Sequence, residues 1–228
     1  MLWYKAWLET RWRMLMPLAL VLFVLFTGHN KGQLVQGQKS VQNALPFFWI
    51  VLPLVIAGGG INTEAPFRVL KGLNGSTGFT LSLPVSRFRL FAARVVFGMT
   101  ATAGFLIAAC CFAWIAFPEV SASIAWNDGL RYAATVLASS FAIFGLATLF
   151  ATFLDQQLRV LACMGSIFFM RWLFAWTNVP EAFDIFRMSG EASPLITHVF
   201  PWASVLLCFG FGVLFLLGAL KIIQQKEY

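Results

Sequence analysis

Acidic residues are scarce in this sequence, which has nine Asp and Glu against 16 Lys and Arg in 228 residues. Charged residues of both signs make up 11% of the chain, well below the share in a soluble domain. The basic residues behind the net charge of +7 stand at the ends of long apolar blocks rather than in one patch. Nucleic-acid binding is therefore disfavoured, and the composition indicates an integral membrane protein surrounded by membrane lipid.

Side chains that bind metals or form disulfides are also few. The sequence has two histidines, and its four cysteines, at positions 110, 111, 163 and 208, all lie in apolar blocks without C-x-x-C spacing. Neither a disulfide framework nor a metal site is predicted, and we expect no cofactor.

The apolar blocks contain no Asp, Glu or His, because His29 and His198 fall at block edges. Proton-coupled transporters usually need a buried acid or histidine, and membrane enzymes need clustered carboxylates or a nucleophile with a base. No catalytic residue is predicted, and a membrane enzyme is disfavoured. The glycine cluster at residues 72–78 lacks the lysine of a phosphate-binding loop, so we do not expect the chain to hydrolyse nucleotide itself.

Arg171 is the one charged residue that lies away from the ends of an apolar block. Its long side chain could deliver the guanidinium to lipid headgroups at the outer surface. Alternatively, it faces the interior of the helix bundle and contacts an anionic substrate or headgroup, which makes it a candidate for the substrate pathway. The sequence leaves both interpretations open.

Six continuous apolar blocks predict an all-α fold with six transmembrane helices. The blocks cover about residues 14–27, 44–61, 95–117, 132–154, 158–177 and 199–223. Spanning strands are excluded because the blocks are continuously apolar and do not alternate.

Residues 1–13 precede the first block and carry a polar stripe of Lys5, Glu9 and Arg13. Trp3 and Trp7 face mostly away from this stripe on a helix. The pattern predicts an amphipathic helix lying in the membrane interface. The alternative is a polar lead-in to the first span.

The distribution of Lys and Arg predicts that both termini are cytoplasmic. If the N-terminus is inside, eleven of these residues lie in inner segments and four in outer segments. The eleven are Lys5, Arg11, Arg13, Arg68, Lys71, Arg87, Arg89, Arg94, Arg159, Lys221 and Lys226, and the four are Lys31, Lys39, Arg131 and Arg187. We expect a multi-pass protein of the plasma membrane, in a bacterium the inner membrane.

Two connecting segments are long. Residues 62–94 form a basic inner loop, and residues 178–198 form an acidic outer loop in which Met188 and neighbouring apolar residues suggest short helices in the outer interface. With no repeat and no separate soluble domain, residues 1–228 are predicted to form a single transmembrane domain.

The inner loop ends in the segment GSTGFTLSLPVSRFRLFAAR at residues 75–94. It resembles the cytoplasmic loop of permease subunits of ATP-binding-cassette transporters of the type-2 exporter family, with Leu-x-x-Pro-Val-Ser-Arg after Gly-Thr. Gly75-Ser76 takes the place of Gly-Thr, and Gly78-Phe79-Thr80 stands where the family often has an acidic residue. The matching positions are Leu81, Pro84, Val85, Ser86, Arg87 and Arg94.

This resemblance implies a permease that moves a lipid, drug or peptide outward, driven by a separate cytoplasmic ATPase subunit and paired with a second permease subunit. The residues expected to couple to the ATPase are Ser76, Thr77, Leu81, Pro84, Val85, Ser86 and Arg87. Residues 76–83 can also form a short helix that Pro84 ends, which suits contact with a soluble partner.

Two alternatives remain at this point. Arg87 and Arg89 could hold the loop on anionic lipid without any partner. The whole chain could also be a membrane anchor that assembles a cytoplasmic complex without transporting a substrate.

Overall fold

The computed structural model describes residues 50–57, 86–116, 124–154, 156–177, 188 and 193–225. Regular structure in these ranges is helical, and the described residues include no strand. The predicted interfacial helix at 1–13, the first predicted span and most of the inner loop lie outside the described residues.

The main helices are α4 (Arg87–Ala116), α6 (Trp126–Phe150), α7 (Gln156–Trp176) and α9 (Trp202–Gln225), with the one-turn helix α8 (Pro194–Thr197) before α9. Four of them, α4, α6, α7 and α9, are long and apolar enough to cross a membrane, so the chain is a membrane-embedded protein. These helices correspond to the last four predicted spans.

Two spans begin earlier than the sequence predicts. Helix α4 starts at Arg87 rather than Val95, so residues 87–94, assigned to the inner loop from sequence, are already helical. Helix α6 starts at Trp126 rather than Tyr132. The hydropathy pattern misses both starts because the first turns of these helices contain polar residues, which lower the local hydropathy although the chain is already helical.

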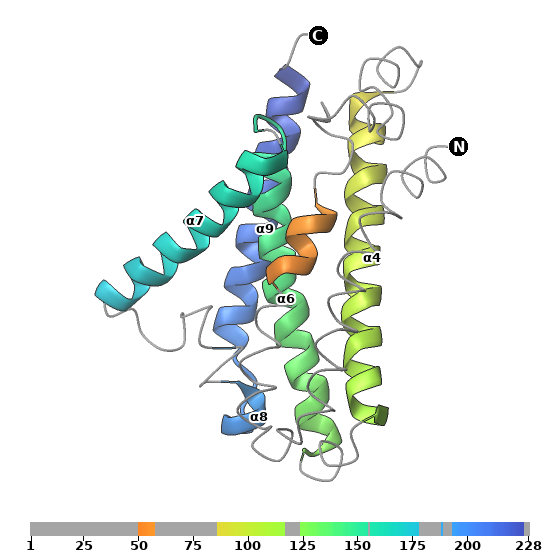
Figure 1. Ribbon diagram of the computed structural model, residues 1–228, viewed down its shortest axis with the longest axis vertical. Coiled ribbons are helices and arrows are strands. Elements are labelled where there is room, and N and C mark those ends of the chain that lie inside the picture. Colours follow the sequence, from red (N-terminus) through yellow and green to blue (C-terminus); the bar gives the residue numbers. More distant parts are fainter. Residues whose placement is uncertain are drawn as a thin grey trace.

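Long helices that follow one another in the sequence run in opposite directions. In Figure 1, α4 runs down the bundle from its upper end, while α6 and α9 run up beside each other. The start of α4, the start of α7 and the end of α9 therefore lie at one end of the bundle, and α8 lies at the other. Helix α7 slopes away from the rest, and only 11% of its membrane-length stretch is buried, against 44% for α6.

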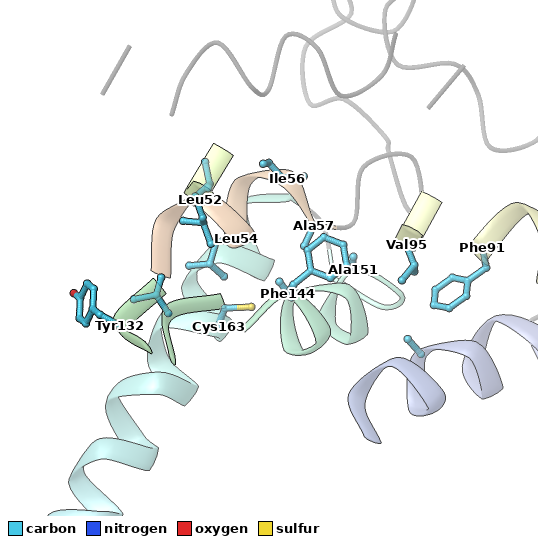
Figure 2. Packing of buried hydrophobic residues seen from close by; sticks show 14 residues of the cluster. Leu52, Leu54, Ile56, Ala57, Phe91, Val95, Tyr132, Phe144, Ala151 and Cys163 are labelled. Carbon is cyan, nitrogen blue, oxygen red and sulfur yellow. The ribbon is translucent and has the colours of Figure 1, made fainter. Parts of the chain in front are cut away.

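The buried core forms where residues 50–57 meet α4 and α6. Leu54, Ile56 and Ala57 are at most 2% exposed and belong to one cluster with Val95 of α4 and Phe144 of α6. Figure 2 shows Leu54 and Ala57 on the side of this segment that faces Phe144. Residues 50–56 are helical, as expected inside the second predicted span, 44–61.

Met188 is the one residue between 178 and 192 that the structure describes. Its side chain is 1% exposed and packs in a second cluster with Ala138, Ala142, Val205 and Cys208. Met188 therefore fills space between α6 and α9. Its apolar side chain predicted burial, but not whether lipid or protein would cover it.

Helices α6 and α9 approach each other closely at two glycines. A Cβ atom added to Gly145 would stand 2.7 Å from the carbonyl oxygen of Gly212, and one added to Gly212 would overlap the ring of Phe141. In lipid, burying apolar side chains between helices gives little free energy, because lipid is equally apolar. Helices are held together instead by close packing, which small residues such as these allow. The Gly145–Gly212 contact therefore fixes the α6–α9 pair.

Hydroxyl side chains on α6 are buried without needing partners from other helices. Thr135 and Thr148 are fully buried, and each donates to a carbonyl three or four residues earlier at 2.7 Å. Satisfying each hydroxyl within the helix avoids the cost of an unpaired polar group in lipid or protein. These threonines therefore give α6 small side chains that allow close packing.

The Gly145–Gly212 contact predicts the effect of substituting glycine. Gly145→Ala should destabilise the protein by about 1–3 kcal/mol, because the new methyl group meets backbone that cannot rotate away. Gly210→Ala, on the same pair of helices, should be neutral or stabilising, since nothing lies within 4 Å of its added Cβ. Unfolding in mixed micelles measures both, and equal stability of the two variants would contradict this packing.

Candidate functional site

Ser86, a residue of the motif that resembles the exporter family, caps the start of α4. The amide of Arg89 donates to Ser86 Oγ at 3.4 Å, and the amide of Leu90 donates to the Ser86 carbonyl at 3.2 Å. A serine that precedes the first helical residue and accepts from the third is the usual N-cap arrangement. The Pro-Val-Ser-Arg motif is therefore where α4 begins.

The first turns of α4 concentrate positive charge. The helix carries Arg87, Arg89 and Arg94 near its start and has no acidic residue in its first turn. Arg89 and Phe88 are exposed, with 54% of Phe88 accessible. Since the N-terminus of a helix is itself positive, a negative group from outside the helix would stabilise these arginines.

The remaining residues predicted to couple to an ATPase are Ser76, Thr77, Leu81, Pro84 and Val85, which lie outside the described residues. For Arg87, only the backbone is described, as the first residue of α4. The coupling role of the whole set stays a prediction.

Other basic residues lie at the same end of the bundle as the start of α4. Arg159 is in the first turn of α7 and is 3% exposed, while Lys221 is exposed near the end of α9. Figure 1 shows that these helix ends lie together. The structure thus collects basic residues that the sequence assigns to three separate inner segments.

Arg171 lies far along α7, away from Arg159 and the start of α4. Its side chain is exposed, as are Phe168 and Trp172 on the same helix. Trp172 stacks on Trp176 with ring centroids 5.6 Å apart, as suits aromatic rings at a membrane interface. Arg171 is therefore not enclosed within the described bundle, and its role in a substrate pathway stays a prediction.

A polar cluster at the opposite end of the bundle joins α6 to the corner between α8 and α9. We define it as Asp128, Arg131 and His198. Asp128 Oδ2 lies 2.6 Å from His198 Nδ1, Arg131 Nη1 lies 3.3 Å from Asp128 Oδ1, and the same nitrogen donates to the His198 carbonyl at 2.8 Å. The Asp128 side chain is only 11% exposed, whereas that of His198 is 71% exposed.

His198 adopts a left-handed backbone conformation with φ 54°, the one positive φ among the described non-glycine residues. For a residue with a Cβ atom this conformation costs about 1–2 kcal/mol. His198 ends α8, and its amide donates to the Pro194 carbonyl at 3.1 Å. The contacts with Asp128 and Arg131 offset part of this strain.

Sequence analysis missed this cluster because it placed Asp128 in a loop. The structure corrects that assignment, since Asp128 lies in the first turn of α6, where the helix dipole favours a carboxylate. The spacing of Asp128 and Arg131 suits one helical turn and was visible in the sequence. The contact with His198 was not, because the partner lies in another part of the chain.

No group of three or more His, Cys, Asp or Glu side chains suited to a metal ion occurs within the described ranges. Asp128 and His198 form a pair, and the third member of their cluster is an arginine. The arrangement can join two elements by charge-assisted hydrogen bonds.

The N-cap gives a direct test at the start of α4. Ser86→Ala should destabilise the first turn by about 1 kcal/mol, because the amide of Arg89 loses its acceptor. Ser86→Asp should retain the cap, since its carboxylate can accept the same bond. Hydrogen exchange of the amides at residues 88–90 measures the difference, and equal exchange in both variants would show that Ser86 Oγ does not cap the helix.

Comparison with protein-family models, curated proteins and solved structures found no match for this chain. Its function is therefore inferred from its own residues and their arrangement.

Proposed function

We propose that this chain is the permease subunit of an ATP-driven exporter, with six spans, both termini in the cytoplasm and a place in the bacterial inner membrane. A separate ATPase subunit would supply energy, and a second permease subunit, identical or related, would complete the pathway. The cargo would be a lipid, an apolar drug or a peptide that leaves the cytoplasm or the inner leaflet.

The observation that carries this proposal is the position of Ser86. The motif that resembles the exporter family runs directly into a membrane-length helix, because Ser86 caps α4 and Arg87 is its first residue. A force applied at Ser86 or Arg87 would therefore act directly on a 30-residue helix. A helix of that length extends about 45 Å, more than the hydrocarbon layer requires.

The packing around α4 gives the force a route to other spans. Phe91 and Val95, one and two turns from the start of α4, lie in the core cluster with residues 52–57 and with α6. A Cβ atom on Gly98 would meet the ring of Phe144, so α4 and α6 are in close contact there. Displacement of α4 by an ATPase would thus shift α6 and residues 52–57 with it.

The exposed basic surface at the start of α4 supports a contact with an acidic partner. Phe88 adds an exposed apolar ring beside Arg89, which is a combination suited to a protein groove. Anionic lipid could also neutralise these arginines, and the membrane-anchor alternative would need only such lipid contacts or a passive partner. Dependence of ATP hydrolysis on this surface separates the two.

Arg87→Glu tests the proposed coupling in the complex purified with its co-expressed ATPase. We expect ATPase binding to weaken or hydrolysis to fall about tenfold or more, since the substitution reverses the charge at the proposed contact. Co-purification and phosphate release from the complex in lipid nanodiscs provide the measurements.

Lys221→Glu is the matched control, because it reverses an exposed charge at the same end of the bundle on α9. It should leave binding and hydrolysis near the parent level. Unchanged binding and hydrolysis in Arg87→Glu would refute coupling through this residue. An ATPase that binds while no substrate moves would favour the membrane-anchor alternative.

A further inference from the structure

Among the contacts between α6 and the segment formed by α8 and α9, two differ in kind. At Gly145 and Gly212 the contact is between backbones, and a single added methyl group would not fit. At the end of the bundle that carries α8, the contact is the polar cluster of Asp128, Arg131 and His198. The first contact breaks only if the helices separate, whereas the second can break by rotation of side chains.

We propose that Asp128, Arg131 and His198 form a releasable latch that holds the outer end of α6 to the α8–α9 corner, and that the two helices pivot about Gly145 and Gly212 when it opens. The idea that the latch opens as a step in transport rests on the proposed function. The idea that this contact has a closed and an open state is independent of that function.

Two residues of α6 bind His198 at different atoms. Asp128 binds the imidazole of His198, and Arg131 binds the carbonyl of His198 while also lying beside Asp128. Because the side chain and the backbone of His198 are both held by α6, the corner cannot turn while the latch is closed. The left-handed backbone of His198 favours release, since an open corner can relax to an ordinary conformation.

Exposure makes release feasible. The side chains of His198 and Arg131 are 71% and 46% exposed, so both return to water when the latch opens. Asp128 is the buried member, and it remains next to the positive N-terminus of α6. A fully buried ion pair could not open in this way without leaving two charges in a dry interior.

The charge balance of this end also depends on the cluster. Within its described residues, α4 has no charged residue beyond Arg94, and the first charged residue of α9 is Lys221 at the other end. From these two helices, therefore, no described charge faces Asp128. Removing either His198 or Arg131 should consequently leave the Asp128 carboxylate with one side-chain partner fewer, and no other charge on these helices would replace it.

Ser193 provides a reporter for opening. It precedes α8, is fully buried, and its hydroxyl has no hydrogen-bond partner among the described residues. A cysteine at this position would be shielded while the α8–α9 corner is closed and would react with a thiol reagent when the corner moves. Replacing the four native cysteines first leaves Ser193→Cys as the reporting thiol.

In this background, Asp128→Asn and His198→Ala should each raise the rate of maleimide labelling about tenfold, since each removes the same link. The double variant should label no faster than the faster single variant, because residues in one contact are not additive. His198→Gly should also label faster, because it loses the imidazole despite its freedom to adopt the left-handed conformation.

Val199→Ala is the matched control, since this neighbouring side chain is 68% exposed and its substitution should leave labelling unchanged. Size-exclusion and thermal-unfolding profiles like those of the parent establish that each variant folds. Unchanged labelling in folded Asp128→Asn and His198→Ala, or fully additive effects in the double variant, would overturn the latch.

A thiol cross-link supplies a second test, in which a covalent connection replaces the Asp128–His198 contact. Asp128→Cys with His198→Cys, joined by a short bifunctional reagent, should slow labelling at position 193 and lower ATP hydrolysis by the complex about tenfold. A reductant that cleaves the link should restore both. Normal hydrolysis with the link in place would refute a role in the cycle, whereas failure to find any ATPase would count against the proposed function alone.

Discussion

The approach of two backbones at Gly145 and Gly212 is the constraint on which the described bundle depends. In lipid, apolar side chains gain little by leaving their surroundings, so helices associate through close packing of small residues and satisfied polar groups. Helix α6 supplies both, with glycine at the contact and two buried threonines, Thr135 and Thr148, whose hydroxyls bond within the helix. It is consequently the most buried of the four spans, and α4 and residues 50–57 pack around it.

The two ends of this bundle differ in charge and in the contacts that hold them. One end collects basic residues and presents the capped, arginine-rich start of α4. The other is joined by Asp128, Arg131 and His198 beside aromatic residues such as Trp126 and Trp202. In the proposed exporter, force would enter at the first end and release a contact at the second, with the glycine contact between them as the fixed point.

Helix α7 does not share this order. It follows α6 after a short turn but slopes away, so most of its apolar surface is left for lipid or for another subunit to cover. Arg171 lies on this exposed helix and Arg159 is buried at its start. The same helix thus places one arginine where partners within the chain must neutralise it and another where the surroundings must.

The sequence by itself determined that the chain is helical and membrane-embedded, because length, continuous apolar character and scarce charge are local properties that a bilayer selects directly. It also located the later spans, although polar first turns hid the starts at Arg87 and Trp126. Only the tertiary structure decided that Met188 is core, that Gly145 meets Gly212, and that Asp128 reaches His198. Each of these contacts joins residues that are distant in sequence. Whether such residues meet depends on how the helices pack, and not on the local conformational preference of any one residue.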